Sequence, residues 1–249
     1  MFKAKTLALS IGLTLGLIAT PALAEKTYTA VTDATFAPFE SLNKKREVVG
    51  FDADIINAIA AKQGFKVKLH NMPWEGLFAS LNNGERDIVI AAVTITPERQ
   101  KSMDFSAPYF DAKQLIVVKE GSPIKQFSDL KGKKVGVQNG TTGDTVVQKQ
   151  FGKTSPDIRR FENITLALSE LANSGVSAVV ADNAVVKNYL VNNPGQKFRL
   201  IDDKSFEVEH YGIAVRKGNK ALLDDINAGL AGIKADGSYQ KIQQKYFGQ

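Results

Sequence analysis

Cysteine is absent from this chain of 249 residues, which contains only one tryptophan and two histidines. The absence of cysteine excludes disulfides, thiolate metal sites and cysteine nucleophiles, so stability has to come from packing. His70 and His210 lie far apart and lack a metal-ligand spacing, so we expect them at the surface or in a hinge. Zinc, nucleophile-elbow, phosphate-loop and dinucleotide motifs are also missing. We therefore expect no metal, no cofactor and no enzymatic activity.

Clusters of like charge are absent as well. The formal net charge is +6, and it falls to +4 when Lys3 and Lys5 are removed with the first 24 residues. The remaining charges alternate in sign along the chain, without the basic stripe that tracks phosphates. This pattern argues against nucleic acid as a partner.

The chain begins with a pattern typical of a secretory signal peptide. Lys3 and Lys5 precede an apolar run over 7–18, and small residues at 22–24 provide a cleavage site before Glu25. The run is shorter than the roughly 20 residues that span a bilayer, and no later segment is apolar enough to be a second span. We expect residues 1–24 to be removed and a soluble, monomeric mature chain from Glu25 to reach the periplasm.

Strand-like and helical segments alternate along the rest of the chain, which favours parallel pairing and an α/β fold. We expect strands at 27–32, 67–69, 88–93, 115–118, 134–137, 178–181 and 207–215. The expected helices are 52–63, 74–82, 146–151, 164–173, 184–191, 220–235 and 239–247, with a helical turn near 128–130. The run 88–93 has the unbroken apolar character of a fully buried strand.

The alternation of strands and helices begins again after residue 115, which predicts two lobes. We assign 25–108 and 210–249 to a discontinuous first lobe and 114–205 to a second lobe. The segments 109–113 and 206–209 would be hinge strands, because the chain has to pass between the lobes twice. Open α/β sheets bind ligands beyond the carboxyl ends of their strands, so the residues just after each strand are the candidates.

Arg99 is delivered to the start of a predicted helix. Thr96 has N-cap chemistry, and Pro97 suits the first helical position. With the hydroxyl of Thr94 and the amides at the helix start, the Arg99 guanidinium would form a receptor for a carboxylate. The alternative is that Arg99 pairs with a surface acid such as Asp104.

Three further places after predicted strands have suitable chemistry, namely 33–40, 139–144 and Asp182. Thr142 lies in a glycine-threonine loop that suits an anion or forms an ordinary flexible turn. Asp182 ends an apolar strand and would either hold an ammonium group or cap the next helix. Asp33, with Phe36 close behind it, and Trp74 at a helix start could line a slot, although both aromatics also suit a core. An arginine, acids and aromatics together meet the demands of a zwitterionic amino acid.

Several segments in this order and spacing resemble a known family. They are 32–39 (TDATFAPF), 50–54 (GFDAD), 95–99 (ITPER), 104–109 (DFSAPY) and 246–248 (YFG). The chain resembles the periplasmic solute-binding proteins of ABC importers, in particular the polar amino acid family that includes glutamine-, histidine- and lysine/arginine/ornithine-binding proteins. The resemblance covers essentially all of 25–249.

The resemblance implies a two-lobed periplasmic-binding-protein fold, with two three-layer α/β lobes, a two-strand hinge and a ligand cleft between the lobes. It implies that Arg99, Thr94 and Thr142 hold the α-carboxylate, and that Asp182 and the backbone at Ala92 hold the α-ammonium group. The residues that would line the side-chain slot are Asp33, Phe36, Trp74 and Gln138. The implied partner is a membrane permease.

Two departures from the family pattern bear on the ligand. Ala91 and Ala92 replace the Ser or Gly that relatives often carry, and Gln138 stands where glutamine binders tend to have Lys. The first removes possible hydroxyl contacts, and the second weakens the case for glutamine. Asp33, with Glu40 and Glu75 nearby in sequence, favours a basic ligand such as arginine or lysine, unless Glu40 and Glu75 point to solvent. Glutamine or another polar amino acid is the alternative, and a periplasmic prephenate- or arogenate-type dehydratase is the rival class. A sensor or adhesin that uses the same cleft is a third interpretation.

Overall fold

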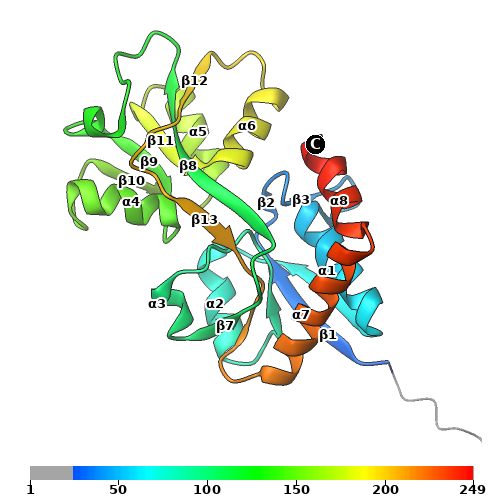
Figure 1. The fold of residues 1–249 in the computed structure, drawn as a ribbon. Helices are drawn as coiled ribbons and strands as arrows, with labels where there is room; N and C mark the ends of the chain where they lie inside the picture. Colours follow the sequence, from blue (N-terminus) through cyan, green and yellow to red (C-terminus); the bar gives the residue numbers. More distant parts are fainter. Residues whose placement is uncertain (1–24, 249) are drawn as a thin grey trace, which may run out of the picture.

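The computed structural model describes residues 25–248, so the predicted signal peptide lies outside the described residues. The helices and strands form two α/β lobes, each around its own sheet (Figure 1). The first sheet comprises, in spatial order, β5 (Lys66–Asn71), β1 (Thr27–Thr32), β6 (Ile88–Val89), β14 (Ala214–Arg216) and β7 (Met103–Phe105). The second comprises β10 (Ile158–Phe161), β9 (Val135–Gln138), β11 (Ala178–Asp182), β8 (Phe110–Lys119) and β12 (Phe198–Ile201).

Helices cover both faces of each sheet. The first lobe contains α1 (Phe51–Gln63), α2 (Trp74–Asn82), α3 (Pro97–Gln100), α7 (Lys220–Ala235) and α8 (Ser238–Phe247). It also contains a small sheet of β2 (Thr35–Phe36), β3 (Glu40–Leu42) and β4 (Val48–Val49). The second lobe contains η1 (Phe127–Leu130), α4 (Thr142–Phe151), α5 (Ile164–Ala172) and α6 (Asn183–Asn192).

The burial pattern of β1 explains the layers of the first lobe. Ala30 belongs to the same buried cluster as Ile56 of α1 and Ile226 of α7, whereas the next residue, Val31, clusters with Leu77 of α2. Successive strand residues point to opposite faces, so α2 covers one face of the sheet and α1 and α7 cover the other. Each lobe therefore has the three layers that the sequence predicts.

Two extended segments run side by side between the lobes. The carboxyl-terminal part of β8 pairs with β11 and β12 in the second sheet. Its first four residues pair instead with β13 (Val208–Tyr211), antiparallel, from Phe110↔Tyr211 to Lys113↔Val208. Since β14 follows β13 into the first sheet, the chain crosses between the lobes along both strands (Figure 1).

Two predicted strands are wrong in extent. The run 88–93 is buried as expected, but β6 ends at Val89, and Ala92 adopts a left-handed φ of 47°. This turn directs the Ala92 N–H to the carboxylate of Asp52 at 2.8 Å. The predicted strand 207–215 is divided at Gly212, where a Cβ would lie 2.8 Å from the side chain of Ile95.

The sequence did not reveal β7, β10, β12 or the small sheet. These strands are two to four residues long, which is too short for a periodic pattern to be recognised. Among residues 25–248, no helix combines the length and apolar character that a membrane crossing requires.

Candidate ligand-binding site

A cavity lies where the two lobes face each other. The cavity and its mouth hold about 320 Å³ of empty space. Both lobes contribute to its wall, and all nine residues predicted from the sequence line it. The lining residues are Asp33, Phe36, Glu40, Trp74, Ala91, Ala92, Thr94, Arg99, Gln138, Thr141, Thr142 and Asp182.

Arg99 occupies the position that the sequence predicts. The hydroxyl of Thr96 caps α3 by accepting the Arg99 backbone N–H at 3.2 Å, and Pro97 is the first helical residue. The guanidinium donates to the carbonyl of Thr94 at 2.8 Å and lies 5.2 Å from the ring centroid of Trp74. A guanidinium has five N–H donors, so these contacts orient it and leave donors for an anion.

Arg99 does not form the ion pair with Asp104 that was the alternative role for this residue. Asp104 pairs with Lys217 at 2.7 Å instead. Burial lowers the pKa of Arg99 to about 10, while the carboxylates of Asp182 and Glu209 act in the opposite direction. The guanidinium is therefore still charged at neutral pH.

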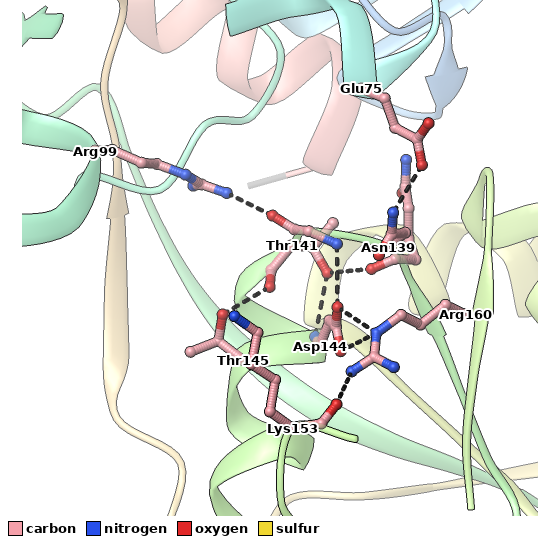
Figure 2. A network of polar contacts seen from close by, with 10 residues as sticks. Glu75, Arg99, Asn139, Thr141, Asp144, Thr145, Lys153 and Arg160 are labelled. Atoms are coloured by element: carbon pink, nitrogen blue, oxygen red, sulfur yellow. Dashed lines mark hydrogen bonds and ion pairs between the residues drawn. The ribbon is translucent and has the colours of Figure 1, made fainter. Parts of the chain in front are cut away.

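Hydrogen bonds hold the loop before α4 in place (Figure 2). Asp144 accepts the backbone N–H of Gly140 at 3.1 Å and is itself held by Arg160 at 3.0 Å. Across the cleft, Arg99 donates to the carbonyl of Gly140 at 3.3 Å. Asn139 donates to Glu75 of the other lobe at 2.7 Å. The loop thus contacts the first lobe at two points.

Thr94 and Thr142 come from different lobes and converge on one carboxylate. Both hydroxyls donate to Oε2 of Glu209 at 2.7 Å. Gln114 donates to the other oxygen of Glu209 at 3.2 Å. The two threonines thus hold a carboxylate, which belongs to Glu209 of β13.

Asp182 does not cap α6, which was the alternative role for this residue. It is the N-cap by position, but its side chain makes no capping hydrogen bond. Its carboxylate instead accepts from the amide of Gln114 at 2.8 Å and from the hydroxyl of Tyr211. Burial, aided by Glu209, raises the pKa of Asp182 to about 6. A ligand cation at this carboxylate would favour its charged form.

Asp33, Phe36, Trp74 and Gln138 gather at the same cavity. Asp33 accepts from the hydroxyl of Thr35 at 2.8 Å and from the amide of Gln138 at 3.0 Å. Burial is the main cause that raises the pKa of Asp33. Trp74 is buried at the start of α2, as the core alternative expects, yet it also lines the cavity. The two roles are therefore compatible.

Glu40, which the sequence places near Asp33 as an acid that lines the slot or points to solvent, is buried and lines the wall. Sequence reasoning missed other residues around the cavity. Gln114, Glu209 and Tyr211 belong to the two crossing strands and hold the side chains of Asp182, Thr94 and Thr142. In the sequence, these three residues could have been found from their positions in or beside the predicted hinge segments.

The histidines are exposed, as expected, and His210 on β13 contacts Asp111 at 2.7 Å.

Comparison with known proteins then decides the family. A model of the bacterial extracellular solute-binding proteins, family 3, matches residues 28–249. The chain belongs to this family. Two-lobed periplasmic binding proteins of the family share its fold, as the sequence predicts.

Relatives in the family align over most of their length. "Probable histidine-binding protein" of Neisseria gonorrhoeae is 47% identical over 223 residues, which cover 89% of this chain and 83% of the relative. "ABC transporter arginine-binding protein 1" of Escherichia coli K12 is 37% identical, with 87% and 88% covered. The crystal structure of the arginine-, lysine-, histidine-binding protein ArtJ from Geobacillus stearothermophilus has a TM-score of 0.87 at 45% identity, with 90% and 96% covered.

Proposed function

We propose that this protein captures a polar L-amino acid in the cavity between its lobes and delivers it to the membrane permease of an ABC importer. The observation that carries the proposal is the placement of Arg99 and Asp182 in one cavity, on different lobes. Opposite charges at fixed positions match the two ends of a zwitterion. The family and the names of the relatives support the same function.

The roles of the lining residues follow from their chemistry. Arg99, Thr94 and Thr142 receive the α-carboxylate. The guanidinium has donors beyond those it gives to the carbonyls of Thr94 and Gly140, and the two hydroxyls already hold a carboxylate, that of Glu209, which the ligand carboxylate replaces. Asp182 and the backbone at Ala92 receive the α-ammonium group. Asp33, Phe36, Trp74 and Gln138 line the slot for the ligand side chain, in which the aromatic rings cover the aliphatic stem.

A basic side chain suits this slot best. Asp33 and Glu40 are both buried carboxyl groups in the cavity wall. A cationic end group offsets the cost of burying their charge, whereas a neutral end group does not. We infer a preference for arginine or lysine, with glutamine and other polar amino acids as weaker ligands.

The hinge, the cellular location and the oligomeric state belong to the same proposal. The segments 109–113 and 206–209 act as the hinge between lobe 1 (25–108 and 210–249) and lobe 2 (114–205). The antiparallel pairing of β8 with β13 supports this assignment. The mature protein begins at Glu25, works in the periplasm as a monomer, and releases its ligand chemically unchanged.

A thermal-shift screen of the twenty L-amino acids tests the function. The protein is first unfolded and refolded to strip bound ligand. Binding to the folded state alone adds about 2.7 kcal/mol at a hundredfold excess over Kd, so a few ligands should raise Tm clearly. The corresponding D-amino acids are the matched controls and should give smaller shifts. A flat result for all twenty contradicts the proposal.

The dehydratase alternative needs a separate readout. Purified protein is incubated with prephenate and with arogenate, and the aromatic product is measured by absorbance. We expect no product, and we expect the bound amino acid to be recovered with unchanged mass. Turnover of either substrate would contradict a pure binding function.

A further inference from the structure

Glu209 lies in the middle of the strand pair that joins the two lobes. It belongs to β13, and its register partner on β8 is Ala112. Its side chain is half-buried and lines a broad groove beside the ligand cavity, with about 2200 Å³ of empty space. Thr94, Arg99 and Thr142 line both the cavity and this groove. Glu209 therefore faces, from the groove side, the end of the site that we assign to the α-carboxylate.

The carboxylate of Glu209 accepts hydrogen bonds from both lobes. Thr94, which precedes α3 in the first lobe, donates its hydroxyl to Oε2 at 2.7 Å. Thr142, the first residue of α4 in the second lobe, donates its hydroxyl to the same oxygen at 2.7 Å. Gln114 of β8 donates to Oε1 at 3.2 Å. Separation of the lobes breaks at least one of these charge-assisted hydrogen bonds, so Glu209 resists opening of the cleft.

A ligand carboxylate cannot share the two hydroxyls with Glu209. A threonine hydroxyl has one hydrogen to donate, and both hydrogens are committed to Glu209. Two carboxylates at the same pair of donors also repel each other, because like charges at close range disfavour the charged form. The α-carboxylate of an amino acid and the side chain of Glu209 are therefore alternatives at this end of the site.

The charge of Glu209 acts on both ends of the site. Burial is the main cause that raises the pKa of Asp182 to about 6, and the charge of Glu209 is the next. Burial lowers the pKa of Arg99 to about 10, and the carboxylates of Asp182 and Glu209 oppose this change. Lys149 of α4 lines the same groove as Glu209. The groove thus offers space and a cation to the Glu209 side chain when another carboxylate takes its place.

We propose that Glu209 is an internal competitor of the ligand, which holds the lobes together through Thr94 and Thr142 until the α-carboxylate displaces it into the groove. The inference rests on the amino-acid-binding function above and adds that Glu209 sets the affinity. Only the fraction of the protein in which Glu209 has left the hydroxyls accepts the α-carboxylate, so the apparent Kd is raised by this competition. No covalent bond forms or breaks.

Removal of the charge on Glu209 should consequently tighten binding. Glu209→Gln keeps the size of the side chain but loses the charge that strengthens both threonine hydrogen bonds. We expect the Kd for L-arginine, measured by calorimetry, to fall about fivefold or more. Glu209→Ala should change it in the same direction, and this variant adds no new donor to the site. A residue that supports the site and stays in place in the complex has the opposite effect when it is removed.

L-argininamide tests whether the competition depends on the α-carboxylate. This probe has an amide in place of the carboxylate, and about pH 6 keeps the α-amino groups of both probes protonated. Its neutral end group does not displace Glu209, so Glu209→Gln should leave its Kd unchanged or raise it. Glu207→Gln makes the same change at an exposed position that lines the same groove, and it should leave the Kd values of both probes unchanged.

Small-angle scattering without added ligand measures how strongly Glu209 holds the lobes. The radius of gyration of Glu209→Ala should exceed that of the unmodified protein, because the hydrogen bonds to both lobes are lost. Saturation with L-arginine should bring the two proteins to the same radius, because the ligand then closes the cleft in both. Glu207→Gln should match the unmodified protein with and without L-arginine.

The outcomes separate this inference from the proposed function. If both Glu209 variants bind L-arginine with unchanged or weaker affinity, or if the radius without ligand does not increase, the inference is wrong and the function stands. If L-glutamine binds and L-arginine does not, L-glutamine and L-glutaminamide replace the two probes. Failure of all twenty L-amino acids to bind would overturn the proposed function instead.

A crystal structure of the unmodified protein with the bound amino acid decides the question even if neither variant folds. The carboxylate of Glu209 should have left the hydroxyls of Thr94 and Thr142, with the α-carboxylate of the ligand in its place. A complex in which Glu209 keeps both hydrogen bonds would overturn the inference.

Discussion

The amide of Gln138 donates a hydrogen bond of 3.0 Å to the carboxylate of Asp33 and so joins the two lobes across the cavity. Gln138 ends β9 of the second sheet, and Asp33 follows β1 of the first. Both side chains are buried, which strengthens a hydrogen bond to a charged or partly charged group. Under the proposed function, this one contact would link closure of the cleft to formation of the side-chain slot.

Gln138→Leu should weaken every amino acid ligand. The variant keeps the volume of the side chain but removes the donor to Asp33, and a hydrogen bond to a charged group contributes about 1 to 3 kcal/mol. Calorimetry measures the affinity, and small-angle scattering with ligand should show a larger radius of gyration. Gln240→Leu, on the exposed surface of α8, is the control. Unchanged affinity and radius would exclude a role for this contact in closure.

Arg99→Ala should abolish or strongly weaken binding while the protein stays folded. Removal of a buried, charged partner typically costs about 2 to 5 kcal/mol, or roughly thirty- to several-thousand-fold in Kd. Lys101→Ala removes an exposed cation one residue after α3, where it pairs with Glu98, and should leave Kd unchanged. Near-normal affinity in Arg99→Ala would remove Arg99 from the site.

The stability of the protein without added ligand should depend on pH through Asp182. Its folded-state pKa of about 6 exceeds the ordinary value of 3.8, so the stabilising contribution is present below about pH 4. It is lost as pH rises through 6, because the folded state must then bury a charge. The free energy of unfolding of Asp182→Asn, minus that of the unmodified protein, should therefore increase from pH 4 to pH 7.

Asp104 provides a control of opposite sign. Its pKa is lowered, chiefly by the hydrogen bond from Lys217, so its contribution is present above the ordinary pKa and lost as pH falls. For Asp104→Asn the same difference should be nearly flat from pH 4 to pH 7 and should rise as the pH falls below about 4. Urea unfolding at each pH measures both differences. A flat or decreasing profile for Asp182→Asn would contradict the burial of this carboxyl group.

Much of the fold could be predicted from local chemistry. Gly64 has a left-handed φ of 71° and ends α1, and the pair Thr96 and Pro97 starts α3. Long helices with a regular apolar pattern, such as α7, were predicted with the bounds that the structure has. Such signals depend on neighbouring residues, which the sequence displays directly.

Contacts between distant residues could not be predicted. Glu209 meets Thr94 although 115 residues separate them along the chain. Glu40 is followed by a polar turn, and nothing in that stretch indicates that this residue is buried in the cavity wall. The bend at Ala92 also escaped prediction, because its left-handed conformation is supported by the Asp52 carboxylate and not by a local turn sequence.

Gly50→Ala should destabilise the protein severely. Gly50 has a φ of 137°, and a Cβ at this position would lie 2.1 Å from the backbone oxygen of Phe39. We expect a loss of about 3 kcal/mol or more in the free energy of unfolding, measured in urea. Gly64→Ala shares the positive φ but meets nothing within 4 Å, so about 1 kcal/mol is expected. Equal losses would show that the close approach at Gly50 is unimportant.

The central claim is that residues on opposite lobes hold the two ends of one amino acid. A crystal structure of the protein with L-arginine measures this most directly. We predict that the α-carboxylate contacts the guanidinium of Arg99 and that the α-ammonium group contacts the carboxylate of Asp182. A ligand bound elsewhere, or a complex in which either side chain points away from the ligand, would contradict the account.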